Sequence, residues 1–139
     1  MYTYDVQYVD FRYDQVKEMG EVDTQGAVKA FHAFPFKEQQ LKARSLSEAT
    51  YPTISFRAHP DKWTLSIWSL EPDLYEVYLE GKGKKVTVET RDQSFIVNAI
   101  ERFFSGGRSE LYEQMAGRPG AVTSQRLWDR IVSMFSRNV

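Results

Sequence analysis

The sequence contains no cysteine and only two histidines among its 139 residues. The absence of cysteine excludes disulfides, thiol nucleophiles and zinc–thiolate sites, and it fits a reducing compartment. Metal sites usually need three or four ligands, and the two histidines, His32 and His59, fall on different predicted elements. We therefore expect no metal ion, no cofactor and no catalytic residue, which favours a protein that is not an enzyme.

Long apolar runs and an excess of one charge are also missing. No stretch approaches the roughly 20 apolar residues needed to span a bilayer, and the first ten residues, MYTYDVQYVD, lack the pattern of a secretory signal. Eighteen basic side chains oppose nineteen acidic ones, so the formal charge of -1 provides no field that would attract nucleic acid or an acidic membrane. We expect a soluble, cytoplasmic protein with neither partner.

Aromatic residues, by contrast, are abundant at 14% of the chain, and apolar residues make up 42%. A chain of this length buries roughly 70% of the surface that it exposes when unfolded, which is enough for a substantial core. No internal repeat, long linker or change of composition divides the chain. The sequence therefore predicts one compact domain over residues 1–139.

The middle of the chain predicts a meander of four antiparallel strands. Their connectors, PDK, EPD and GKG, contain the Pro or Gly that tight reversals need. Residues 2–8 alternate between apolar or aromatic and polar side chains, which predicts an edge or second-layer strand. The four strands of the meander are Thr53–His59, Trp63–Ser69, Leu74–Glu80 and Lys84–Thr90.

Apolar residues at three- and four-residue spacings predict helices over residues 24–34, 93–104 and 124–137, with a shorter amphipathic piece near residues 109–115. Asp23 and Asp92 are suited to cap the first two helices, and Pro35 and Gly106 to end them. Residues 37–52 give no clear assignment. The predicted fold is α+β, with a mostly antiparallel sheet of four to five strands and helices packed on one face.

Strand alternation divides the predicted sheet into an apolar and a polar face. Trp63 shares the apolar face with Leu65 and belongs to the core, whereas Trp68 shares the polar face with Ser66. One interpretation is that Trp68 simply covers a cross-strand neighbour. The other is that it forms the aromatic centre of a protein-binding patch with a charged rim. The candidate binding residues of this patch are Trp68, Tyr78, Arg57, His59, Glu76 and Glu89.

One stretch, PDLYEVYLEGK, matches the PD...ExK signature of a nuclease superfamily, whose two acids share a Mg²⁺ ion. Here the two acids, Asp73 and Glu80, fall on a single predicted strand. Their separation is roughly 23 Å, and they point to opposite faces of the sheet. These acids cannot hold one ion, so the match does not predict a nuclease.

The layout of the chain resembles that of small bacterial immunity proteins of toxin–immunity systems. The resemblance covers residues 31–104 and lies in the order FHAFPFKEQQ, a polar spacer, YPTISFRAHPDKWTLSIWS and a hairpin with a Gly turn. It is a resemblance of pattern without an invariant motif, so no family residue can be transferred to a position here. It implies a compact α+β cytoplasmic domain that neutralises a partner toxin by binding it.

The leading hypothesis is therefore a non-enzymatic binding protein, such as an immunity or inhibitor protein. It would use the outer sheet face, with Trp68 and Tyr78 as anchors and the charged residues for orientation. An alternative is a small-molecule-binding protein or enzyme, with a pocket between the sheet and the C-terminal helices lined by Tyr112 and Trp128. A third is a homodimer formed through the last helix, with Trp128 and Val132 in the interface.

Overall fold

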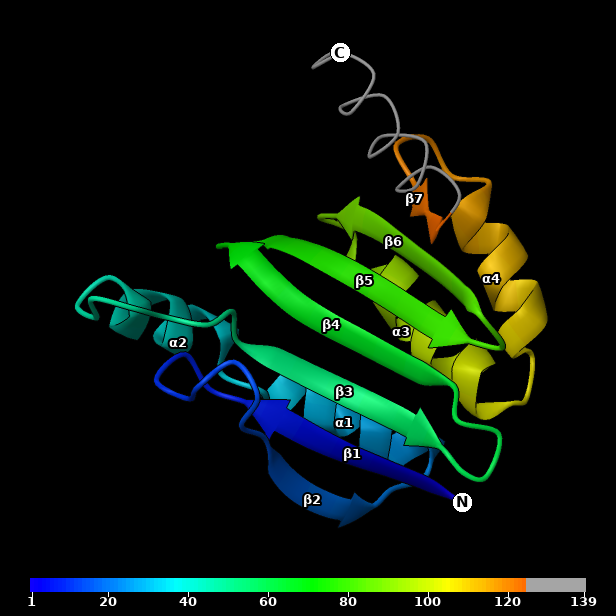
Figure 1. The fold of residues 1–139 in the computed structure, drawn as a ribbon, viewed down its shortest axis with the longest axis horizontal. Coiled ribbons are helices and arrows are strands. Elements are labelled where there is room, and N and C mark those ends of the chain that lie inside the picture. The colour runs from blue at the N-terminus through cyan, green and yellow to red at the C-terminus, as the bar shows by residue number, and fades with distance from the viewer. Residues whose placement is uncertain (125–139) are drawn as a thin grey trace, which may run out of the picture.

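The computed structural model describes residues 1–124 of the chain. Within this range the strands form one antiparallel sheet in the order β2-β1-β3-β4-β5-β6-β7 (Figure 1). The strands are β1 (Tyr2–Gln7), β2 (Lys17–Glu21), β3 (Thr53–Ala58), β4 (Thr64–Glu71), β5 (Leu74–Gly81), β6 (Lys84–Thr90) and β7 (Val122–Thr123). The helices are α1 (Thr24–Ala33), α2 (Phe36–Ala43), α3 (Gln93–Phe104) and α4 (Arg108–Ala116).

The α+β class and the antiparallel sheet are confirmed, but the prediction of four to five strands is wrong. The sheet has seven strands within residues 1–124, because β2 and β7 extend its two edges. Strand β1 consequently lies inside the sheet, between β2 and β3, and is not an edge strand. All five residues of β2, KEMGE, are exposed, so this strand is held by its backbone pairing with β1 and carries no apolar alternation.

The predicted meander is confirmed, with strand boundaries shifted by at most two residues. Its register aligns apolar side chains in rows on the inner face of the sheet. In one such row, Ile54 pairs with Ile67, Ile67 with Val77, and Val77 with Val88, and all four are buried. Trp63 adds to the same core, with only 3% of its surface exposed. The alternation in the sequence therefore identified the inner face correctly.

Helices α1 and α3 lie side by side behind the sheet and cover its inner face (Figure 1). Both predicted caps are present: Asp23 accepts a hydrogen bond from Gly26 N at 2.7 Å, and Asp92 accepts one from Ser94 N at 2.9 Å. The previously unassigned residues 37–43 belong to α2, which buries Phe36. Helix α4 packs beside β6, the strand next to the β7 edge of the sheet (Figure 1).

The predicted C-terminal helix, with Trp128 and Val132, lies outside the described residues. In the part of the chain that is described, no helix combines the length and the apolar character that a membrane crossing requires.

Candidate functional site

Trp68 and Tyr78 lie together on the outer face of the sheet, opposite α1 and α3. Trp68 of β4 pairs directly with Glu76 of β5, and Tyr78 pairs with Ser66 of β4. The two aromatic residues are therefore diagonal neighbours, with ring centroids 5.9 Å apart and planes tilted by 42°. Both are half-buried. The predicted pair thus exists and leaves part of each ring accessible.

These two rings line a groove of about 410 Å³, which we call the aromatic groove. Two tyrosines from outside the central strands join them: Tyr13 is 88% exposed and Tyr51 is 54% exposed. The residues that line the groove are Gln7, Tyr13, Thr50, Tyr51, Thr53, Ser66, Trp68 and Tyr78. Four aromatic side chains consequently meet around one depression on an otherwise polar sheet face.

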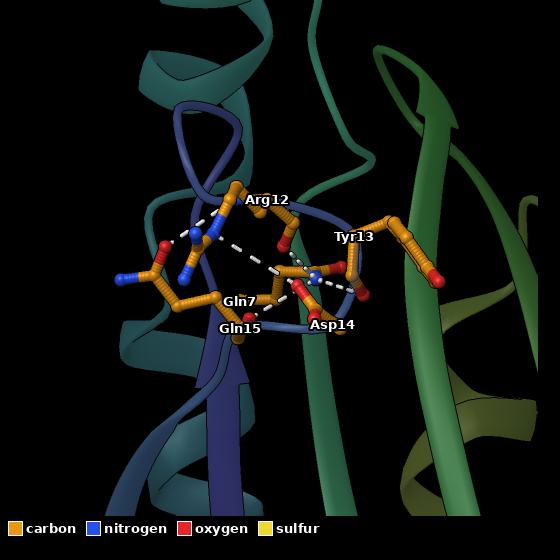
Figure 2. A network of polar contacts seen from close by, with 5 residues as sticks. All are labelled: Gln7, Arg12, Tyr13, Asp14 and Gln15. Atoms are coloured by element: carbon orange, nitrogen blue, oxygen red, sulfur yellow. Dashed lines mark hydrogen bonds and ion pairs between the residues drawn. The ribbon is translucent and has the colours of Figure 1, made fainter.

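The loop that carries Tyr13 is fixed by the side chain of Gln7, the last residue of β1. Its Nε2 donates hydrogen bonds to three backbone carbonyls, those of Arg12 at 3.0 Å, Tyr13 at 2.9 Å and Gln15 at 3.1 Å. A turn closes the loop, because Gln15 N donates to Arg12 O at 3.0 Å. Figure 2 shows this network, with the Tyr13 side chain pointing away from it. The network therefore leaves the ring free to line the groove.

The second tyrosine is positioned by Thr50, which ties the segment before β3 to the segment after β1. Thr50 N donates to Val9 O at 3.0 Å, and its Oγ1 donates to Tyr8 O at 2.9 Å. The carbonyl of Tyr51 then accepts a hydrogen bond from Thr53 Oγ1 at 2.8 Å. The predictions missed both tyrosines, because neither lies on a predicted strand or helix. Tyr51 is placed by contacts between segments about 40 residues apart, and Tyr13 by a loop held by the side chain of Gln7.

Two acidic residues flank the groove. Glu76 pairs across the sheet with Trp68 on one side and with Glu89 of β6 on the other. Burial and the neighbouring charge of Glu89 raise the pKa of Glu76, and hydrogen bonds from Trp68 and Thr87 only partly offset this. Within residues 1–124, every ion pair engages other carboxylates. Both predicted acids therefore lie beside the anchors without an ion pair to any cation of residues 1–124.

A third carboxylate, Glu80, has local partners instead. Tyr78 donates its hydroxyl hydrogen to Glu80, and the ammonium of Lys85 lies 3.8 Å from the same carboxylate. Burial, together with this hydrogen bond and the charge of Glu80, raises the pKa of Tyr78. Tyr78 is consequently a neutral phenol at physiological pH.

The two predicted basic residues, Arg57 and His59, lie at the other end of β3. Arg57 Nε donates to Asp5 Oδ2 at 2.6 Å, and Asp5 is only 6% exposed. His59 makes a 2.9 Å hydrogen bond with Thr3 Oγ1. Since Thr53 is the residue of β3 that pairs with Trp68, Arg57 lies roughly 13 Å further along the strand. The structure brings four of the six predicted residues together and leaves these two apart.

A larger hollow of about 740 Å³ lies near the N-terminus, but several of its side chains already serve the fold. Asp23 caps α1, and the rings of Tyr2 and Phe104 stack on each other with centroids 4.4 Å apart. No group of three histidine, aspartate or glutamate side chains that could hold a metal occurs in residues 1–124. The aromatic groove is therefore the better candidate for a binding site.

The predicted pocket near the C-terminal helices can be traced only through Tyr112, because Trp128 is outside the described residues. Tyr112 is half-buried, and the ammonium of Lys84 lies 5.2 Å from the centre of its ring.

Comparisons of the chain with protein-family models, curated proteins and solved structures gave no match. A functional assignment must therefore come from the geometry of the chain itself.

Proposed function

We propose that this protein is a non-enzymatic binding domain that captures a protein partner through the aromatic groove. The observation that carries the proposal is the convergence of four aromatic side chains, from two strands and two loops, around one depression. Tyrosine and tryptophan are enriched at the centres of protein interfaces because they bury much area and lose little conformational entropy. If the aromatic residues only covered the sheet, Tyr13 and Tyr51 would be expected to lie buried against it. Both side chains instead remain largely exposed.

The groove is also organised before a partner arrives. The hydrogen bonds from Gln7 and Thr50 fix the two loops against the sheet. Fixing a loop in its bound conformation lowers the entropic cost of association. Glu76 and Glu89 would orient the partner, whereas Arg57 and His59 would reach only a partner that extends along the whole face.

The resemblance in layout to immunity proteins favours a toxin domain as the partner. An inhibitor of this kind needs an exposed recognition surface and no reactive groups, which agrees with the groove. The proposed role is to neutralise the toxin by covering a surface that the toxin requires. Copurification with the product of an adjacent toxin-like reading frame, followed by inhibition of its activity, would test this role.

The binding site itself is tested by affinity capture with three versions of the full chain: wild type, Trp68→Ala and Thr64→Ala. Thr64 lies on the same strand and face as Trp68 but outside the groove, so it is the matched control. The captured protein is then purified and its affinity measured by isothermal titration calorimetry. We expect Trp68→Ala to weaken binding by about 30-fold or more, as for a central interface anchor, and Thr64→Ala to have little effect.

The proposal fails if the purified partner binds folded Trp68→Ala and Tyr78→Ala variants as tightly as the wild type. Circular dichroism of each variant would establish that it is folded. Such a result would place the binding surface elsewhere on the molecule.

A further inference from the structure

The acidic pair beside the aromatic groove is unfavourable for the isolated protein. Glu76 and Glu89 are direct cross-strand partners, and like charges in that relation destabilise a sheet. The ion pairs of residues 1–124 use other acids, so no cation of the described part of the chain neutralises this pair, and hydrogen bonds from Trp68 and Thr87 offset the repulsion only in part. A positive charge of a partner would therefore meet two carboxylates that form no ion pair within the described part of the chain.

The rings of the groove are likewise not engaged by cations of the described chain. Within residues 1–124, arginine and lysine lie over other rings, namely those of Tyr2, Phe95, Phe103 and Tyr112. A tryptophan or tyrosine face attracts a cation placed within about 6 Å of the ring centre. Among the residues that the structure describes, the groove thus combines aromatic faces that no cation covers with two carboxylates at its edge that no cation pairs.

We infer that the aromatic groove receives a basic side chain of the protein partner, in particular an arginine, paired with Glu76 and Glu89. This inference rests on the proposed function and specifies the chemistry of the partner. Arginine fits better than lysine because its planar, weakly hydrated guanidinium can stack on Trp68 or Tyr78 while donating several hydrogen bonds to carboxylates. The partner surface that enters the groove would therefore be basic, as charge complementarity requires.

A defined probe can test this without knowledge of the partner. The probe is a five-residue peptide, glycine–arginine–glycine–arginine–glycine, with acetylated and amidated ends. Its control has citrulline, the neutral isostere of arginine, at both arginine positions. Both peptides are titrated into the ¹⁵N-labelled full chain, and the indole N–H signal of Trp68 is followed by NMR. Substitution of each tryptophan by phenylalanine assigns that signal.

We expect the arginine peptide to shift the Trp68 signal and to bind about five-fold more tightly than the citrulline peptide. Glu76→Gln and Glu89→Gln should each weaken binding by about three-fold, and added salt should weaken it further. Glu101→Gln on α3 removes the same charge from the helical layer and should leave the affinity unchanged. The two glutamine variants at the groove remove a repulsion, so loss of folding will not obscure the result.

Equal affinity for both peptides, or no shift of the Trp68 signal by either, would overturn the inference. It would also be overturned if the chain formed a dimer in sedimentation that Trp68→Ala abolished, because the occupant would then be a second copy. The proposed function is judged separately, by the purified partner. If the affinity for that partner depends on Trp68 but not on Glu76 or Glu89, the groove binds a protein, and the inference that it receives a basic side chain is wrong.

Discussion

The indole of Trp63 lies so close to Gly81 that a Cβ built on this glycine would come within 2.1 Å of Trp63 Cδ2. Trp63 immediately precedes β4, and Gly81 ends β5, where Thr64 pairs with Glu80. Because glycine has no Cβ, position 81 leaves the space that the Trp63 indole occupies. This contact fixes how the largest residue of the core packs against the sheet.

Gly81→Ala should therefore destabilise the protein, because the added methyl group displaces a buried indole. We expect a loss of about 1 to 3 kcal/mol in the free energy of unfolding, the usual cost of overpacking. Gly117→Ala is the control, since its Cβ would come no closer than 3.4 Å to another atom. Urea denaturation of both variants measures the difference. Equal stability of the two variants would show that Trp63 can move aside.

The two tryptophans should respond differently to truncation. Trp63→Ala removes a buried core side chain and should cost about 3 to 5 kcal/mol. Trp68→Ala removes a half-buried ring from a cross-strand contact and should cost about 1 kcal/mol or less. The same denaturation measurement compares them. If both variants lost similar stability, Trp68 would be a structural cover and its assignment as an anchor would be wrong.

Strand alternation was sufficient to separate these two residues from the sequence alone. It also predicted the inner face of β3 to β6, because every second residue of each strand meets the same core. It could not reveal β2, whose polar residues are held only by backbone pairing to β1. Nor could it place β1 inside the sheet, since that position depends on β2.

The candidate site was predictable only where it lies on strands. Trp68, Tyr78, Glu76 and Glu89 share one face by parity and were found together. Tyr13 reaches the groove through a loop that is held by hydrogen bonds from the side chain of Gln7, and strand alternation does not describe a loop, so the alternation could not predict it. Arg57 has the correct parity, but its distance along β3 and its ion pair with Asp5 separate it from the groove.

The Gln7 network provides a test of how the groove is organised. In Gln7→Glu, a carboxylate would replace the amide nitrogen that donates to the carbonyls of Arg12, Tyr13 and Gln15. We expect the loop to open about tenfold more often, equivalent to about 1.4 kcal/mol. Trypsin cleavage after Arg12 measures this opening. Gln25→Glu, on the exposed side of α1, adds the same charge and should not change the cleavage rate.

The Arg57–Asp5 ion pair lies at the end of the outer face away from the groove, and we expect its removal to lower the stability of the protein. Arg57→Ala would leave the buried carboxylate of Asp5 without its partner, at a cost of about 1 to 3 kcal/mol. Adding Asp5→Asn to this variant removes the unpaired charge and should recover part of the loss. Thermal unfolding of the single and double variants measures the coupling. Additive losses would show that the pair contributes little.

The acidic pair at the groove predicts a gain of stability on substitution. Because the pKa of Glu76 is raised in the folded protein above its ordinary value of 4.5, the folded state holds this proton more tightly than the unfolded state. The stability contributed by Glu76 therefore decreases as pH rises from 4.5 through the raised pKa, and the penalty remains at neutral pH.

Glu76→Gln should consequently be more stable than the wild type at pH 7, by about 0.5 kcal/mol, with a smaller difference at pH 4. Urea denaturation at the two pH values measures this, and Glu101→Gln is the control for loss of a negative charge. A variant that was less stable at pH 7 would show that the hydrogen bonds from Trp68 and Thr87 to Glu76 outweigh the repulsion by Glu89. The Glu76→Gln variant is also compared with the wild type for binding: we expect it to be more stable and to bind the arginine peptide less tightly. Both results together would link the repulsion between Glu76 and Glu89 in the free protein to recognition, because a bound cation neutralises the same two charges.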